Sequence, residues 1–536
     1  MTAVRTPPQP SRMLTLGGTT YPVFLPSIRD PRLHVASVII TIHVLGQVGL
    51  HFRVSVPQIL AAILTTAVIE VALTFRQTKS FVWPASAMLT GSGVALILRV
   101  VGTPPDDPWN TYAWYVFAGI AAFALLTKYV IKYRGTHVFN PSNIGLVVAF
   151  IVLGNSRIEP LDFWWAPLTN PAMILAYVVI IGGGLLITRR LRLLALAGTF
   201  WVTLAVGVGI LAASGHSMVA NWAFAPVTGF DFWRVIVTSP EVMIFLFFMI
   251  TDPKTTPSGR VGRVTFGFLV GVMSTLLMAP QTDEFGTKVG LLAGLVVICA
   301  ARPILDRLLP APRSESDEIG SFARRVALGG NAGLVRGIAG VGLTLGLVLA
   351  LGVGIVAAGT PARGVVAVNL NEALDRVPHQ IDPSTLPSIT VGQDVADFDP
   401  TLVGANAQEV VKTMAENLEL ENQALLRRDG TILPAVDHGD RLDEMQARLA
   451  DAIAMGTTTV DHYRFDDVSM SLLKPFGKQS GLSIGLSSTG TMTEETYDAA
   501  GKLLASRDAP FDRIFVVRRA TGDRWLNVAV LPPIGG

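Results

Sequence analysis

The first 360 residues consist largely of apolar runs long enough to cross a lipid bilayer. Such runs, of about 17 to 24 residues, match the roughly 30 Å thickness of the hydrocarbon core. Charged residues make up only 15% of the chain, against about 25% in soluble domains. The fifth predicted span is short enough to be tilted or half-inserted, so the sequence predicts ten or eleven transmembrane helices. The predicted spans are 33–52, 56–75, 82–101, 111–131, 141–154, 169–188, 191–213, 234–250, 264–280, 286–302 and 334–358.

The charges between these spans alternate along the whole series. Loops with Lys and Arg, such as those at Arg76, Lys132 and Arg189, alternate with acidic or aromatic loops. Basic loops stay on the cytoplasmic side of a membrane. The pattern predicts a multi-pass protein of the plasma (inner) membrane, with a cytoplasmic N-terminus and an extracytoplasmic C-terminal domain.

The charge balance changes near residue 360. Residues 361–536 hold 16 Lys and Arg against 25 Asp and Glu, a net charge of −9, whereas residues 1–360 hold 26 against 15, or +11. Such a break indicates a domain boundary. We therefore divide the chain into a poorly ordered cytoplasmic tail (1–30), a membrane domain (31–303), a cytoplasmic linker (304–333), a final transmembrane helix (334–358) and an acidic domain (361–536).

Within the acidic domain, residues 361–400 look extended and are followed by two segments with helical periodicity, 404–428 and 438–455. The period then shifts toward two, which predicts strands over 459–472, 481–488, 491–497, 513–519 and 524–531. A turn at 520–523 joins the last two. Two helices before an antiparallel meander resemble cone-shaped folds of the nuclear-transport-factor-two kind. The specific similarity lies in residues 497–501 and in Trp525. The predicted fold class is an all-α polytopic membrane protein followed by an α+β soluble domain.

A polar segment, residues 135–143, lies between the fourth and fifth spans, and we call it the hinge segment. Lipid cannot satisfy free backbone groups, so a Gly/Asn/Pro break between apolar helices needs a reason. One interpretation is structural: Asn140-Pro141 starts a helix and Lys128 reaches the headgroups. The other is a binding site. Its candidate residues are Lys128, Gly135, Phe139, Asn140, Pro141 and Asn143.

Two further motifs lie in or at the ends of spans. Residues 83–93 place Ser86 and Thr90 among small residues, which favours close helix packing or contact with a cofactor. Residues 251–257 place Asp252 at a helix exit, where the helix dipole disfavours an acid. We expect Asp252 to pair with Lys254 or Arg260, or to form a turn.

Two carboxylates lie within predicted spans. Glu70 is the deeper one, and it has no obvious partner in the sequence. Glu241 could instead be an N-terminal acid of its helix. Because intramembrane carboxylates are costly, both are candidates for an ion pathway.

A single cysteine, Cys299, excludes a disulfide or cysteine-ligated cluster within one chain, and no metal site is predicted.

The hinge segment, the 86–93 stretch and residues 248–253 resemble the NqrB/RnfD family. These proteins are membrane subunits of the sodium-pumping NADH:quinone reductase and of the Rnf electron transport complex. The resemblance covers roughly residues 60–305, in the expected order, and it extends to divergent, actinobacterial-type members, here with an added C-terminal domain. It implies a membrane subunit of a flavin-dependent, ion-translocating oxidoreductase. The expected partners are the lipid bilayer and other membrane or envelope subunits, and no nucleic acid is expected.

The sequence departs from the family at the covalent flavin site. The family carries a Ser-Gly-Ala-Thr stretch whose Thr is esterified to FMN, and this stretch is missing here. The nearest outside-loop analogue, residues 226–231, does not fit. We therefore expect non-covalent FMN or riboflavin rather than covalent FMN. The sequence also lacks a dinucleotide fingerprint and a Walker loop.

Three functions stay open at this point. The first is a redox membrane subunit that binds flavin and couples electron transfer to cation transport. The second is a transporter or export component, since broken helices also form transport sites. The third is a membrane scaffold whose outer domain binds a partner or cargo.

Overall fold

The structure of this chain is a computed structural model. It describes residues 11–50, 52–104, 107–160, 168, 170–220, 226–312, 314, 317–328, 346–347, 349–359, 386–473, 483–519 and 524–533.

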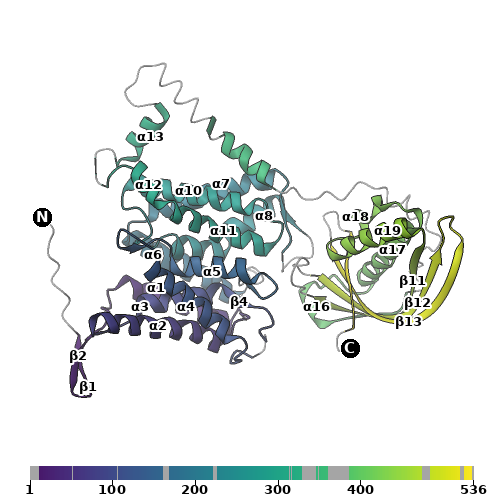
Figure 1. The fold of residues 1–536 in the computed structure, drawn as a ribbon, viewed down its shortest axis with the longest axis horizontal. Helices are drawn as coiled ribbons and strands as arrows, with labels where there is room; N and C mark the ends of the chain where they lie inside the picture. Colours follow the sequence, from purple (N-terminus) through teal and green to yellow (C-terminus); the bar gives the residue numbers. More distant parts are fainter. Residues whose placement is uncertain are drawn as a thin grey trace. The chain divides into compact units, whose positions relative to one another are not determined.

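The chain forms two compact units, which we describe separately. The first comprises Met1–His216, Gly229–Gln281 and Phe285–Thr360, and the second comprises Ser217–Thr228, Thr282–Glu284 and Pro361–Gly536. The first unit is mostly helical, and residues 386–533 of the second combine helices with a sheet (Figure 1). The predicted fold class, a polytopic helical membrane protein followed by an α+β domain, is confirmed.

The helices of the first unit follow the predicted apolar runs. They are α1 (Pro31–Val48), α2 (Val56–Thr78), α3 (Ala85–Ile97), α4 (Trp114–Val130), α5 (Pro141–Leu153), α6 (Pro171–Arg190), α7 (Leu194–Ala213), α8 (Gly229–Thr238), α9 (Pro240–Ile244), the π-helix η1 (Phe245–Met249), α10 (Arg260–Met278), α11 (Glu284–Ala300), α12 (Arg302–Leu308) and α13 (Ile319–Leu328).

Six of these segments are long and apolar enough to cross a membrane, with Gly229–Met249 counted as one. The pair α11 and α12, bent by 56°, makes up to seven. Shorter apolar helices occupy α3, α4, α5 and Leu349–Ala358. The last of these lies in the predicted 334–358 span, of which residues 334–345 and 348 lie outside the described residues. The count of ten or eleven spans stays a prediction.

Several helices begin with the same chemical device. An Asp, Ser or Asn side chain accepts a backbone N–H of the first turn, and a proline follows within two positions, where its missing N–H costs nothing. These starts are Asp30-Pro31, Ser55 with Pro57, Asn140-Pro141, Asn170-Pro171 and Ser239-Pro240. At Ser55 the device is a full capping box with Gln58.

The N-terminal tail, predicted to be poorly ordered, contains two strands, and the linker contains helices. Within the tail, β1 (Arg12–Leu16) pairs with β2 (Thr19–Phe24) through a Gly17-Gly18 turn in which both glycines have positive φ. The second strand also pairs in parallel with β3 (Phe81–Val82). In the linker, α12 and α13 are helical.

The second unit contains a five-stranded sheet in the order β10 (Ile389–Val391), β11 (Thr458–Leu473), β12 (Ser483–Tyr497), β13 (Leu503–Arg519) and β14 (Trp525–Leu531). The first pair is parallel and the others are antiparallel. Three of the strands are long and strongly curved (Figure 1). A short hairpin of β8 (Ser217–Met218) and β9 (Val227–Thr228) also belongs to this unit.

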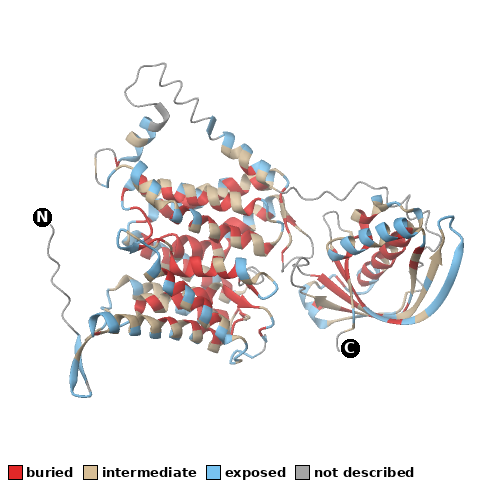
Figure 2. Ribbon diagram, in the orientation of Figure 1, coloured by how far each residue is buried: buried red, intermediate tan, exposed pale blue. Residues whose placement is uncertain are grey.

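Helices cover one face of this sheet. They are α16 (Gln393–Phe398), α17 (Ala405–Arg427), α18 (Leu433–Val436, preceded by the 3-10 turn η3, Gly430–Ile432) and α19 (Asp440–Met455). The core lies between α17 and the sheet, where Val411 and Met414 join Phe465, Phe515 and Trp525. Figure 2 shows the buried residues of α17 facing the strands.

The strand predictions for this unit were correct in type but partly wrong in extent. Segments 481–488 and 491–497 form one strand, β12, and β13 begins at Leu503 rather than at 513. Asp498 closes the hairpin between these two strands, because its carboxylate accepts from the backbone N–H of Ala500 and Lys502. A helix, α16, lies in the segment predicted to be extended. Residues 361–385 and the 520–523 turn lie outside the described residues.

A charged network is buried between α17, α19 and β14. Arg441 donates to both Glu421 oxygens, and to Glu444 at 2.9 Å. Asn527 donates to Glu421 at 2.9 Å. The Asp437 carboxylate is 1% exposed and lies beside the Glu421 carboxylate. Burial and the neighbouring Glu421 raise the pKa of Asp437 well above its usual 3.8, and Arg441 opposes this shift only in part.

The replacement Asp437→Asn should therefore stabilise the second unit at neutral pH. A carboxyl group with a raised folded pKa contributes full stability below its unfolded pKa of 3.8 and loses it as the pH rises through the folded pKa. The amide stays neutral, so the gain should exceed about 1.4 kcal/mol at about pH 7 and vanish near pH 4. Urea titrations of the full chain in detergent, followed by limited proteolysis, would measure this gain.

The exposed Asp467 of the same sheet provides the control, since Asp467→Asn should change stability little at any pH. A loss of stability in Asp437→Asn at neutral pH, or an equal gain at acid pH, would contradict the assignment.

Candidate functional site

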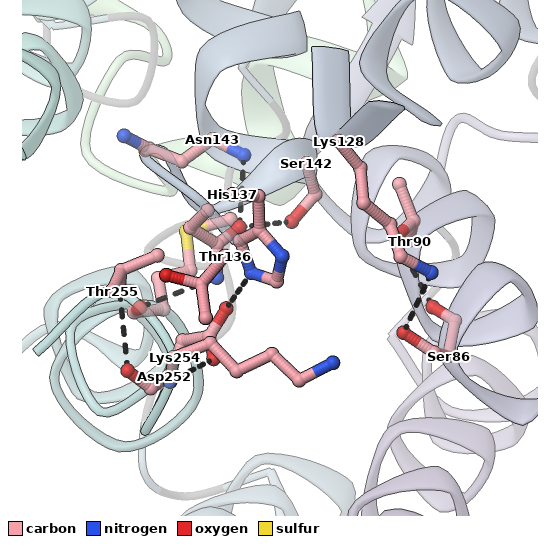
Figure 3. Close-up of polar contacts among 12 residues, drawn as sticks. Ser86, Thr90, Lys128, Thr136, His137, Ser142, Asn143, Asp252, Lys254 and Thr255 are labelled. Carbon is pink, nitrogen blue, oxygen red and sulfur yellow. Dashed lines mark hydrogen bonds and ion pairs between the residues drawn. The ribbon is translucent and has the colours of Figure 1, made fainter. Parts of the chain in front are cut away.

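Three motifs that are far apart in the sequence line one cavity of about 410 Å³ in the first unit. Ser86 and Thr90 come from α3, Asn140 and Pro141 from the start of α5, and Asp252 from the end of the helix containing η1. The cavity also receives the start of α1 and the end of α6. Figure 3 shows Ser86 and Thr90 on one side of this space and His137 and Asp252 on the other.

The hinge segment begins with a tight hairpin. Strand β5 (Lys132–Tyr133) pairs with β6 (Thr136–His137), and both loop residues, Arg134 and Gly135, have positive φ values of 48° and 78°. Two successive left-handed residues are typical of a type I′ turn, which favours glycine. Gly135 therefore has a turn role, and neither it nor Phe139 lines the cavity.

Asn140 holds the hinge segment in place through both ends of its amide. Its Oδ1 accepts from the backbone N–H of Asn143 at 3.2 Å and from the Ser142 hydroxyl at 2.8 Å. Its Nδ2 donates to the carbonyl of Met249 at 3.2 Å. Because Met249 ends a π-turn, its carbonyl would otherwise lack a helical partner. Asn140 thus joins the start of α5 to the end of η1.

Asn143 serves the packing of the helices rather than the cavity. It is 1% exposed, and its Nδ2 donates to the Leu292 carbonyl of α11 at 3.0 Å. It does not line the cavity.

Asp252 pairs with a residue that the sequence analysis missed. Its Oδ2 lies 3.1 Å from His137 Nε2, and its Oδ1 accepts from the backbone N–H of Lys254. The expected pairing with a side chain of Lys254 or Arg260 is replaced by this histidine. His137 lies in the hinge segment itself, so its position beside the Asn-Pro start could have marked it.

The two roles expected of the 83–93 stretch, close helix packing and contact with a cofactor, fall on different residues of α3. Gly91 faces α2, where a Cβ would lie 2.6 Å from Thr66 Oγ1, so this face serves close packing. Ser86, Thr90 and Gly93 line the cavity. The Thr90 hydroxyl bonds only to the Ser86 carbonyl of its own helix among the described residues, at 3.1 Å.

Glu70 has a partner after all. Lys128 Nζ lies 3.0 and 3.2 Å from the two Glu70 oxygens and 3.4 Å from Ser86 Oγ. Tyr129 also donates to Glu70. Lys128 points toward α2 and α3, where Glu70 and Ser86 lie. It lies behind the cavity wall, which it contacts through Ser86.

Glu241 forms a second intramembrane pair. It lies in the first turn of α9, capped by Ser239, and is 3.2 Å from Lys288 Nζ of α11. Both residues line a small apolar space of about 30 Å³ that shares Ile97 and Ile244 with the lining of the main cavity. The sequence analysis missed Lys288, although a lone lysine inside the 286–302 span is itself a signal.

Several charged side chains line the cavity. Asp30 and Arg32, paired at 2.6 Å, line it together with His137, Asp252 and Lys254. The hydrogen bond from Arg32 lowers the pKa of the Asp30 carboxyl, so the pair stays charged. Apolar and aromatic side chains, including Phe247 and Phe248, line other parts of it. The cavity can thus hold a partly apolar ligand with a polar edge.

Comparison with known proteins finds distant relatives. No protein-family model matches this chain. The chain is similar to a subunit of the ion-translocating oxidoreductase complex of Escherichia fergusonii, with 28% identity over 36% of this chain and 68% of the relative. The equivalent proteins of Salmonella paratyphi B and Salmonella newport are 27% identical over 41% of this chain and 76% of their own. This similarity supports the resemblance to the NqrB/RnfD family at a distant level.

The Glu70–Lys128 pair leads to a stability prediction. Glu70→Gln and Lys128→Met should each destabilise the first unit by about 1–3 kcal/mol, because each leaves a part-buried charge without its ion-pair partner. The double variant should be more stable than either single variant. Thermal unfolding midpoints of the full chain in detergent would measure this coupling.

A solvent-exposed pair provides the control. Asp231 and Arg234 lie 3.1 Å apart with 70% and 54% of their side chains exposed, so Asp231→Asn should change the midpoint little. Simple addition of the two single effects would mean that Glu70 and Lys128 do not interact.

Proposed function

We propose that this chain is a membrane subunit of an electron-transport complex and that it holds a flavin without a covalent bond in the 410 Å³ cavity. The observation that carries this proposal is the meeting of the 86–93 stretch, the hinge segment and the Asp252 motif around one space. These are the motifs on which the family resemblance rests. The relatives are named as subunits of an ion-translocating oxidoreductase complex, which favours a redox complex with other membrane proteins.

The cavity suits a flavin in size and in chemistry. Ligand pockets commonly span about 300–1,000 Å³. A flat aromatic ring system needs apolar walls, which Phe247 and Phe248 supply, and hydrogen-bond partners at its edge. Ser86, Thr90 and His137 can supply these partners, and Arg32 and Lys254 could hold a phosphate if the flavin is FMN. A bound flavin would supply one- and two-electron transfer.

The two intramembrane carboxylates fit a role in cation coupling. Glu70 and Glu241 are each paired with a lysine, so each site has a charge balance that an entering cation or proton would alter. Ser86 connects the Glu70–Lys128 pair to the cavity wall. We propose a divergent, actinobacterial-type member of this family in the inner membrane, with its N-terminus in the cytoplasm and residues 361–536 outside.

A transport function is the second candidate. Ser239-Pro240 and the π-turn interrupt the Gly229–Met249 segment next to the cavity, and broken helices are used for substrate sites in transporters. The same cavity would then bind a transported solute.

Flavin content separates these two functions. The purified full chain should be yellow and release FMN or riboflavin on denaturation. Thr90→Leu adds apolar bulk to the cavity wall and should lower the flavin content roughly tenfold, equivalent to about 1.4 kcal/mol. Absorbance and extraction, normalised to protein, would measure it.

Thr199→Leu is the matched control. Thr199 also bonds to a carbonyl of its own helix, at 2.7 Å in α7, and it does not line the cavity. Its flavin content should match the wild type. A flavin-free preparation from flavin-replete cells would overturn the redox proposal and favour transport.

A further inference from the structure

A second cavity, of about 420 Å³, lies wholly within residues 401–525 of the second unit. It is formed by the start of α17 and by the facing ends of β13 and β14. Arg519 ends β13, and Arg524 directly precedes Trp525 at the start of β14. The cavity therefore has two guanidinium groups in its wall.

Arg524 is held in position by a buried amide. Its Nη2 donates to Asn417 Oδ1 at 2.6 Å, and Asn417 Nδ2 donates to the carbonyl of Trp525 at 2.9 Å. Asn417 is fully buried in the middle of α17. One hydrogen bond to a neutral amide therefore holds the Arg524 guanidinium, and a second bond holds that amide in place.

Arg524 also keeps an unused donor. Its Nε is buried and has no hydrogen-bond acceptor among the described residues. A guanidinium has five N–H donors and no acceptor, and a buried donor without a partner is costly. Burial lowers the pKa of Arg524, and Glu416 and Glu409 offset this only in part. An anion in the cavity would balance the charge of this guanidinium.

Glu409, the acidic residue of the cavity lining, does not take the place of such an anion. The Glu409 side chain is 64% exposed and lies 3.8 Å from Lys412, at the rim. Leu402 and Trp525, each 6% exposed, form the apolar part of the cavity wall. Thr413 adds a hydroxyl. Cationic and apolar groups therefore meet in one space.

We propose that this cavity binds a small organic oxyanion, a carboxylate or a phosphate ester, with its charged end at Arg524 and its apolar body against Leu402 and Trp525. Arginine suits both kinds of oxyanion because its planar fork can donate two parallel hydrogen bonds. The site is independent of the membrane cavity and of any flavin.

Calorimetric titration of the purified full chain with benzoate, phenyl phosphate and inorganic phosphate tests this proposal. At least one of the two aromatic anions should bind at millimolar concentration or below, and the tighter of the two identifies the headgroup. Arg524→Gln should weaken that binding roughly tenfold to a hundredfold, as expected for loss of a charge-assisted hydrogen bond. Arg464→Gln, which removes a 77% exposed arginine of β11, should leave it unchanged.

A space-filling variant guards against misfolding. Asn406 is exposed at the cavity mouth, so Asn406→Trp should block binding while the far-ultraviolet circular dichroism stays the same. No binding of either aromatic anion, or equal binding by Arg524→Gln with the fold retained, would overturn the proposal. Equally tight binding of inorganic phosphate would also overturn it, because the apolar wall would then contribute nothing.

Discussion

Helix ends inside an apolar body must find partners for their backbone groups, and the first unit depends on this constraint. Lipid offers no hydrogen bonds, so an unsatisfied N–H or C=O costs several kcal/mol. Asn140 meets the constraint twice, because one amide caps α5 and also satisfies the last carbonyl of η1. Without it, two interrupted helices would each expose polar backbone at the same place.

Buried charges then fix how the helices lie against one another. Glu70 with Lys128, Glu241 with Lys288, and Arg99 with Glu159 each join segments that are distant in the sequence. A slip of one helix past another would leave two charges unpaired in a medium that cannot solvate them. These pairs therefore add specificity to packing that small residues such as Gly91 make close.

The sequence predicted the parts of this architecture that depend on local chemistry. Apolar length located the helices, and the Asn140-Pro141 pair predicted a helix start because capping involves neighbouring residues. The interaction partners of the polar side chains were harder to predict, since the His137–Asp252 and Glu70–Lys128 contacts depend on which helices lie side by side. The limits of the strands in the second unit were also not predicted. The curved β12 and β13 continue through polar residues, and only the pairing between the strands supports these residues.

The structural and binding interpretations of the three motifs are compatible, because they fall on different atoms. Asn140 uses both ends of its amide within the protein, so its replacement should disturb stability before it disturbs a ligand. Thr90 bonds only within α3 among the described residues and turns toward the cavity. Breaks between helices leave polar groups and loosely packed space, and a cavity can form there. The same breaks therefore need capping residues and also provide a binding site. Substitutions at residues without a capping role are the ones that test ligand binding.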